Sequence, residues 1–167
     1  SVHLKTSRAY RDYIAWLQQQ DLTQAEVFWK SYLASLEGPT RLSFKDIIQE
    51  KAEKDYDITS LAFSFEETEE IKAFAGRHGL TLNTVIQGAV GTVLRAYTQQ
   101  LEIVMGITVS GRGMDLPGIE EMVGLFINTL PLRIAPNLTE DPVTFLGELQ
   151  EQAQKINEYG YFSLAQI

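Results

Sequence analysis

The fold is decided by the stretch Met122-Val123-Gly124-Leu125-Phe126-Ile127-Asn128-Thr129-Leu130-Pro131-Leu132-Arg133. Its apolar alternation predicts a strand that carries Asn128 on the same face as Phe126 and Leu130. An amide among apolar neighbours costs roughly 1–3 kcal/mol if it has no hydrogen-bond partner, so we expect partners for Asn128. Pro131 cannot donate to a strand ladder, which predicts an edge or a bulge at that position.

Helical and extended patterns surround this stretch. Residues 10–17, 25–36, 65–78, 82–97 and 142–156 have apolar residues at helical spacing, and 58–65 and 103–109 have strand patterns. The order is two helices, strand, two helices, strand, loop, strand and helix. It predicts the α/β class, as a two-layer sandwich with helices packed on a mixed β-sheet. The exposed edges of so small a sheet predict partner pairing or a homo-oligomer.

Several signals set the helix ends and faces. Two capping boxes, Thr23–Glu26 and Ser64–Glu67, predict helix starts, and the pair Asp141-Pro142 predicts another. The helix after Thr81 has a wide apolar arc and is expected to be the most buried helix. Gly88 and Gly91 each cost about 1 kcal/mol inside it relative to Ala, which predicts the close approach of another backbone.

Composition limits the classes of function. The 167 residues are 44% hydrophobic and 22% charged, which is typical of one globular domain. A formal charge of −8 and no Lys/Arg cluster argue against nucleic acid as a partner. Cysteine is absent, which excludes disulfides and thiolate chemistry within this chain. No apolar run approaches the roughly 20 residues that span a bilayer, and the first residues lack a signal-peptide layout. We expect a cytoplasmic protein without membrane contact.

Four blocks resemble the condensation domains of nonribosomal peptide synthetases. Residues 123–133 resemble the family signature IGxFVNTLxLR, and Ser110-Gly111-Arg112 resembles its SGR turn. Residues 8–16 resemble the block YxDYAxW, and residues 161–164 resemble the approach to later motifs. The family motif HHxxxDG is missing, because Leu4-Lys5 follows His3 and Gly79-Leu80 follows His78. We therefore assign no catalytic residue, and no spacing predicts a metal site.

The resemblance implies a lobe similar to chloramphenicol acetyltransferase. Family members have two such lobes, and a tunnel between them receives phosphopantetheine arms of carrier proteins. By motif order the chain begins just after HHxxxDG. Residues 1–39 are then a helical segment that leads from the N-terminal lobe, 40–56 a charged connection, and 57–167 a partial C-terminal lobe.

The resemblance also places candidate substrate- and tunnel-lining residues, which are Asn128, Phe126, Thr129, Ser110, Gly111 and Arg112. The resemblance implies that Asn128 shapes the site or holds the substrate; the alternative is that it satisfies neighbouring backbone and fixes the fold. Arg112 contacts a pantetheine phosphate or forms an ion pair across the lobes; the alternative is a solvated turn arginine. Positive φ angles are the simplest role for Gly111 and Gly113.

The implied reaction is amide formation between a carrier-bound acyl or aminoacyl thioester and an aminoacyl acceptor. The chain alone is expected to be inactive and to bind no cofactor directly, whereas the parent uses phosphopantetheine arms. Expected partners are peptidyl carrier domains, an adjoining adenylation domain and the N-terminal lobe. Two alternatives stay open: a piece of a carrier-dependent acyltransferase or starter domain, and a non-catalytic module that binds carrier proteins.

Overall fold

The computed structural model describes residues 7–42, 58–137 and 139–167, which belong to two compact units. Unit 1 takes its residues from the ranges 1–38, 104–133 and 151–167, and unit 2 from the ranges 39–103 and 134–150. Both units therefore combine segments that are distant in the sequence. The three-part division predicted from the sequence stays a prediction, and its charged connection lies largely outside the described residues.

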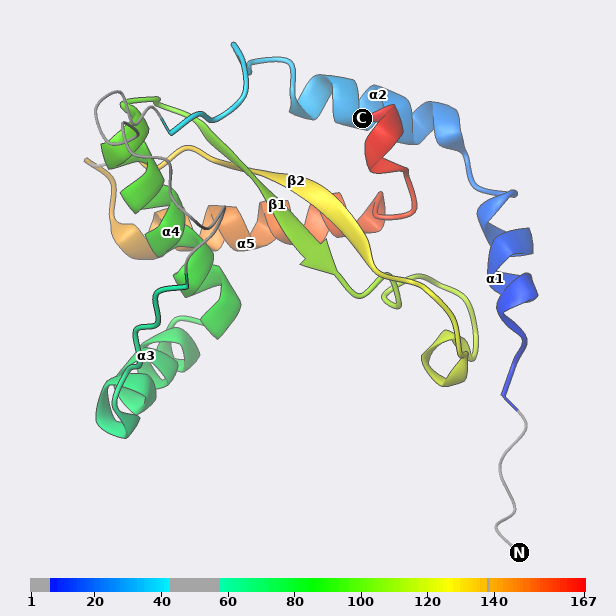
Figure 1. The fold of residues 1–167 in the computed structure, drawn as a ribbon, viewed down its shortest axis with the longest axis horizontal. Helices are drawn as coiled ribbons and strands as arrows, with labels where there is room; N and C mark the ends of the chain where they lie inside the picture. Colours follow the sequence, from blue (N-terminus) through cyan, green and yellow to red (C-terminus); the bar gives the residue numbers. More distant parts are fainter. Residues whose placement is uncertain (1–6, 43–57, 138) are drawn as a thin grey trace, which may run out of the picture. The chain divides into compact units, whose positions relative to one another are not determined.

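Unit 1 is built around a strand pair. Strands β1 (Ile103–Val109) and β2 (Asn128–Ile134) form a two-stranded sheet and run in opposite directions (Figure 1), and all their residues except Ile103 and Ile134 belong to this unit. The unit also contains α1 (Tyr10–Leu17), α2 (Leu22–Tyr32), the 3-10 turns η1 (Ile119–Glu121) and η2 (Leu164–Gln166), and the last turns of α5 (Pro142–Glu158).

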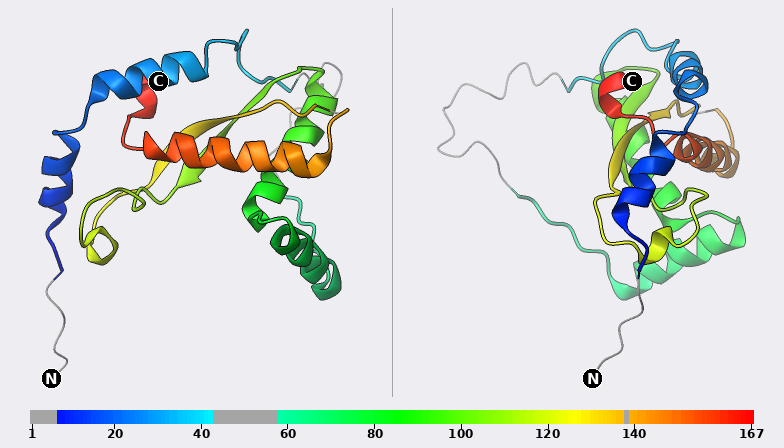
Figure 2. Two further views of the ribbon diagram at one scale, coloured as in Figure 1. Left: turned by 180° about the vertical axis from the view of Figure 1, so that it is seen from behind. Right: turned by 90° about the vertical axis from the view of Figure 1, so that its right-hand side faces the viewer.

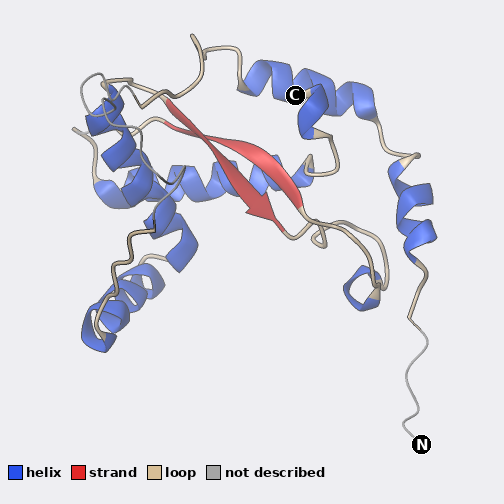
Figure 3. Ribbon diagram, in the orientation of Figure 1, coloured by secondary structure: helices blue, strands red, loops and turns tan. Residues whose placement is uncertain are grey.

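The chain has the predicted α/β class. Helices come before and after the two strands in the sequence, and Figure 3 distinguishes the helices from the strand pair by colour. The described part of the sheet is an antiparallel pair, formed by β1 and β2.

The start of α2 differs from the prediction. Asp21 caps this helix and accepts hydrogen bonds from the backbone N–H groups of Thr23 (3.0 Å) and Gln24 (3.1 Å). The capping box expected at Thr23–Glu26 is therefore wrong, and the helix begins at Leu22. A carboxylate at the cap satisfies two free N–H groups and meets the positive end of the helix dipole, so it takes precedence over a hydroxyl within the first turn.

The helix ends predicted in unit 2 are confirmed. Helix α3 (Phe65–Arg77) begins with the expected capping box, in which Glu67 N–H donates to Ser64 Oγ (3.1 Å) and Ser64 N–H donates to Glu67 Oε2 (2.7 Å). Gly79 ends it with a φ of +67°. Thr81 then caps α4 (Leu82–Thr98) through a 3.0 Å bond from Thr84 N–H. Asp141 accepts from Thr144 N–H (3.1 Å) where α5 starts.

The strand expected at residues 58–65 is wrong. Residues 58–64 have no regular secondary structure, and Leu61 is 85% exposed and Phe63 61% exposed. Alternation shows only that one face can be buried, whereas a strand also needs a neighbouring backbone with which to pair. Within the described ranges β1 and β2 pair with each other alone, so this segment has no strand beside it.

Helix α4 buries its small-residue face rather than its apolar arc. Its buried residues are Thr84, Gln87, Gly88 and Gly91, whereas the apolar residues Ile86, Val93 and Tyr97 are exposed. With four buried residues α4 has more than any other described helix, as expected, but the face that it buries is not the predicted apolar arc. The glycines do allow a close approach, but of side chains rather than backbone: a Cβ at Gly88 would overlap Leu146, and one at Gly91 would lie 2.5 Å from Ile134 Cγ2. The start of α5 accordingly lies beside α4 (Figure 2).

This packing predicts opposite effects of one substitution at two helical glycines. Gly147→Ala is expected to stabilise the chain by about 0.5–1 kcal/mol, because a Cβ there meets no atom within 4 Å and Ala is the better helix former. Gly88→Ala is expected to destabilise it by about 1–3 kcal/mol, because the methyl group overlaps Leu146. Urea denaturation of both variants checks the pair, and equal shifts of the midpoint would contradict the packing of α4.

Candidate functional site

The candidate site is the loop of residues 110–127, which joins β1 to β2 within unit 1. It begins with a bend at Gly111, whose φ is +64°. A Cβ at that position would collide with the carbonyl oxygen of Phe126, so the two ends of the loop meet there. The positive φ expected for Gly111 is confirmed. At Gly113 the same expectation is wrong, because the positive-φ glycines of the described chain are Gly79, Gly111 and Gly118.

Arg112 stabilises the loop through contacts with residues of the loop itself. Its Nη1 donates to the carbonyl oxygen of Ile119 (2.5 Å) and its Nη2 to that of Met122 (3.0 Å). The guanidinium Cζ lies 4.2 Å from the centroid of the Phe126 ring, which is a cation–π distance. A guanidinium is planar and has five N–H donors, so it can bind several carbonyl oxygens that point in different directions. Arg112 therefore stabilises the loop and is not a solvated turn residue.

An aromatic cluster holds the loop against α1. Tyr13 and Phe126 are buried and their rings lie 4.8 Å apart, and Tyr10 meets Phe126 edge-on at 5.2 Å. The Tyr10 hydroxyl donates to Leu125 O (2.6 Å), and the ring covers Gly124 so closely that a Cβ there would overlap it. Burial raises the pKa of Tyr13, and the neighbouring Tyr10 adds to this, so its hydroxyl stays protonated at neutral pH. These contacts pack the aromatic face of α1 against the loop.

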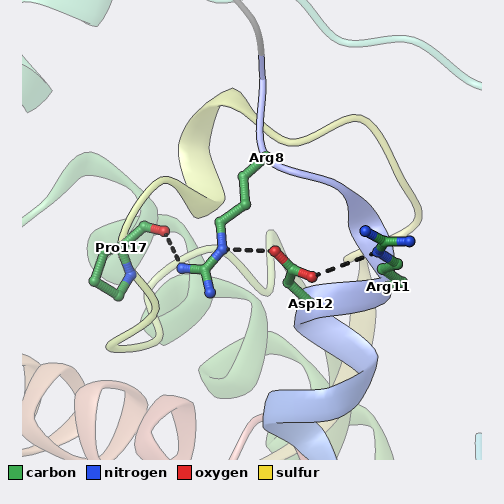
Figure 4. A network of polar contacts seen from close by, with 4 residues as sticks. All are labelled: Arg8, Arg11, Asp12 and Pro117. Carbon is green, nitrogen blue, oxygen red and sulfur yellow. Dashed lines mark hydrogen bonds and ion pairs between the residues drawn. The ribbon is translucent and has the colours of Figure 1, made fainter.

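Arg8 links the segment before α1 to the loop through polar contacts. Arg8 donates through Nε to Asp12 Oδ2 (2.9 Å) and through Nη1 to Pro117 O (2.9 Å), as Figure 4 shows. Arg11 approaches the second carboxylate oxygen of Asp12 at 3.8 Å. These side chains are solvent-exposed, so the ion pairs contribute little energy, and their main effect is to fix the segment before α1 against the loop.

Asn128 has the hydrogen-bond partners that its position predicts. Its Nδ2 donates to the carbonyl oxygens of Gly160 (2.7 Å) and Phe162 (3.1 Å), and its Oδ1 accepts from Thr129 N–H (2.9 Å). The amide thus joins the first residue of β2 to the turn that follows α5. Each of these bonds goes to backbone, so the geometry favours the fold-fixing alternative for this residue.

The structure brings only some of the predicted lining residues together. Gly111, Arg112 and Phe126 meet inside the loop, whereas Asn128 bonds to a different segment. Ser110 accepts a 3.3 Å bond from Arg112 N–H, and Thr129 Cγ2 lies 3.0 Å from where a Cβ of Gly106 would stand. Their role in lining a tunnel stays a prediction.

An outward row of apolar residues was not predicted from the sequence. Val123, Leu125 and Ile127 are all exposed, while the alternate residues Met122 and Phe126 point into the cluster. The signal was present, because an extended segment that is apolar at successive positions has two apolar faces and only one can meet its own loop. We name Val123, Leu125 and Ile127 the outward row.

Neither a membrane span nor a metal cluster was found where the structure describes the chain. No helix there has the length and apolar content needed to cross a bilayer. Groups of three or more metal-ligating side chains do not occur among the same residues.

Comparison with known proteins adds the decisive observation. A family model described as "Condensation domain" matches residues 1–167, the whole chain. The chain belongs to the condensation-domain family. One of the linear gramicidin synthase polypeptides of Brevibacillus parabrevis is 44% identical over 162 residues, which are 96% of this chain and 3% of that protein. Bacitracin synthase 1 of Bacillus licheniformis is 38% identical over 167 residues, or 100% of this chain and 3% of that protein.

Solved structures confirm the fold of this condensation-domain chain. The first condensation domain of the CDA synthetase matches with a TM-score of 0.67 at 20% identity, covering 84% of this chain and 30% of that one. The epimerization domain from the third module of tyrocidine synthetase B matches with a TM-score of 0.74 at 18% identity, covering 96% and 37%. The chain therefore spans about a third of those solved chains, and a far smaller share of the synthetases.

The role of Arg112 in this condensation-domain loop can be tested by a conservative change. Arg112→Lys is expected to destabilise the chain by about 1.5–3 kcal/mol, because one ammonium cannot reach the carbonyls of Ile119 and Met122 together. Urea denaturation measures the change, and Arg77→Lys on the exposed surface of α3 is the matched control. Equal stability of the two variants would return Arg112 to the solvated-turn alternative.

Proposed function

We propose that the chain supplies part of a condensation domain that forms amide bonds in a peptide synthetase. The acceptor amine nitrogen attacks the thioester carbonyl carbon of the donor, the C–N bond forms and the C–S bond breaks. The carrier thiol takes a proton as it leaves, and the amine loses one. Family membership supports this reaction, and both substrates would arrive on phosphopantetheine arms of carrier domains.

The proposal rests on one observation: the segment of residues 123–133, which resembles the family signature, has one side packed in the protein and one side exposed. Its inner side is fixed by the Phe126 cluster and by the amide of Asn128, so the segment has little freedom to move. Its other side presents the outward row to whatever lies against the loop. A rigid apolar edge is suited to contact the rest of the domain or an extended pantetheine-linked substrate.

This division assigns supporting roles to most of the predicted lining residues. Within the loop, contacts are made by Gly111, Arg112 and Phe126. Asn128 instead donates hydrogen bonds to the turn after α5. We propose that they position the site, and that the outward row, with Ser110 and Thr129, supplies its contact surface. A positioning role explains why such side chains occur in a signature without reaching a substrate.

The chemistry itself needs a group that we do not assign to this chain. His78 is the C-cap of α3 in unit 2, and His3 lies outside the described residues. We therefore propose that the isolated chain does not turn over. The direct test supplies it with a loaded donor carrier and a loaded acceptor carrier, and product formation above the carriers alone would overturn this point.

A binding titration separates the remaining alternatives. The apo and holo forms of one carrier domain are titrated into the chain, and tighter binding of the holo form supports a tunnel wall that contacts the arm. Equal affinity of both forms supports a non-catalytic docking module. If the parent synthetase transfers only fatty acyl groups, it belongs with the acyltransferase or starter domains.

The outward row can be tested in the parent synthetase. Leu125→Ser is expected to lower the rate of amide formation about tenfold, the equivalent of roughly 1.4 kcal/mol, because a buried Leu contributes about 1.5–3 kcal/mol to a contact. Leu101→Ser is the control, since Leu101 is 72% exposed and Leu125 is 73% exposed. Similar rates in both variants would remove the outward row from the proposal.

A further inference from the structure

A hollow on unit 1 lies away from the loop and has no part in the proposed function. It has a volume of about 580 Å³ and is lined by α2, by the end of β2 and by the last turns of α5. That volume falls within the range of small-molecule sites. The residues that matter below are Phe28, Tyr32, Arg133, Gln152, Lys155 and Tyr159.

The charge of the hollow is opposite to that of the chain. Arg133 and Lys155 line it, and none of the described residues in its lining is Asp or Glu, although the chain carries a formal charge of −8. Two cationic side chains in such a lining create a positive local potential, and concave surroundings concentrate the field. The hollow is therefore suited to an anionic group.

Arg133 is held in place by Tyr32. Its Nη1 donates to the Tyr32 carbonyl oxygen (2.7 Å), and its backbone N–H donates to the Tyr32 hydroxyl (2.9 Å). Burial raises the pKa of Tyr32, so the hydroxyl stays protonated and donates to Gln152 Oε1 at 3.5 Å. A guanidinium fixed in this way loses little side-chain entropy when an anion binds.

Aromatic rings form the apolar part of the wall. Phe28 stacks on Tyr159 with centroids 4.1 Å apart and an interplanar angle of 14°, and its ring lies 5.7 Å from that of Tyr32 at 10°. The three rings pack on one another and form an apolar part of the wall. Such a wall favours another ring or a branched apolar group, since aromatic pairs attract one another beyond the effect of the area that they bury.

From this combination we infer that the hollow binds a small molecule in which a carboxylate is joined to an aromatic ring. The carboxylate lies at Arg133 and Lys155, and the ring lies against Phe28 and Tyr159. Free aromatic acids and the C-terminal aromatic residue of a released peptide share this chemistry. The inference does not depend on the proposed function, because none of these residues belongs to the loop or to the outward row.

The test uses 3-phenylpropanoate as the probe and its neutral amide as the matched control ligand. Two-dimensional NMR of the 167-residue chain is expected to show saturable shifts at residues 28, 155 and 159, with the acid binding about tenfold tighter than the amide. Lys155→Gln is expected to weaken the acid about fivefold and to leave the amide unchanged. Lys72→Gln on α3 is the control variant and should change neither affinity.

A second pair of probes separates the two sources of the ligand. Tighter binding of a tripeptide that ends in Phe than of 3-phenylpropanoate supports a released peptide, and the reverse order supports a free acid. Equal binding of acid and amide, no saturable shifts, or full affinity in Lys155→Gln would overturn the inference. Binding of an acidic internal peptide segment without binding of 3-phenylpropanoate would also overturn it and would indicate a protein-docking surface instead.

Discussion

Replacing Gly111 with Ala is expected to destabilise the chain by about 2–5 kcal/mol. The φ of +64° costs a residue with a Cβ about 1–2 kcal/mol. The new methyl group also collides with the carbonyl oxygen of Phe126, and relieving such a clash in a packed region costs about 1–3 kcal/mol more. Since a typical domain is stable by only about 5–15 kcal/mol, urea denaturation should show a large fall of the midpoint.

Gly118→Ala is the matched control for that experiment. Gly118 lies in the same loop and has a φ of +81°, but a Cβ there would stand 3.8 Å from Arg8, an ordinary contact. It should therefore show the cost of the backbone conformation alone, about 1–2 kcal/mol. If Gly111→Ala is no worse than Gly118→Ala, the close meeting of residues 111 and 126 does not stabilise the loop.

Local signals in the sequence predicted local structure well. The Ser64–Glu67 capping box and the end of the helix predicted at residues 65–78 were confirmed because each depends on hydrogen bonds or φ angles within one helix turn. The wrong helix start predicted at Thr23 also has a local cause. Asp21 and Thr23 can both cap a helix and lie two residues apart, and the structure has Asp21 as the cap of α2.

The buried face of α4 was not predictable from its own residues. Thr84 and Gln87 are buried, and Thr84 Oγ1 donates to Gln150 Oε1 (3.0 Å) on α5. Gln150 also accepts from Thr81 N–H (2.8 Å) and donates to Gly79 O (3.0 Å), so its amide satisfies the start of α4. A hydrophobic period shows which face is apolar, but the neighbouring element decides which face is covered.

The candidate site shows the same limit. Its sequence predicted that Asn128 needs partners, but not that they are carbonyls at residues 160 and 162. For Arg112 the sequence predicted a phosphate, an ion pair or solvent as its surroundings, and it did not predict the loop carbonyls of Ile119 and Met122. Backbone carbonyls have no sequence identity, so a pattern of residue types cannot reveal them as partners.

Asn128→Asp is expected to destabilise the chain by about 3–4 kcal/mol. The substitution is nearly isosteric, but a carboxylate has no N–H to donate, so the carbonyl oxygens of Gly160 and Phe162 lose their donor. A half-buried carboxylate that faces two carbonyl oxygens is also repelled by them, and an unsatisfied buried acceptor alone costs about 1–3 kcal/mol. Urea denaturation at neutral pH measures the loss of stability.

The pH dependence of the Asn128→Asp variant shows whether its lower stability comes from the missing N–H donors or from altered packing of the side chain. Repulsion by the two carbonyls raises the pKa of the introduced carboxyl in the folded state above its unfolded value. The variant therefore gains stability as pH falls through that folded pKa, because the protonated carboxyl has a donor again, and the gain is complete below the unfolded pKa of about 3.9.

Asn83→Asp, on the exposed first turn of α4, is the matched control for the change at position 128. It should alter stability little or raise it slightly, because a carboxylate there meets the positive end of the helix dipole. A variant at position 128 that behaves like this control would show that the amide of Asn128 does not hold β2 to the turn after α5. Its place in the signature would then have to be explained by contact with a substrate.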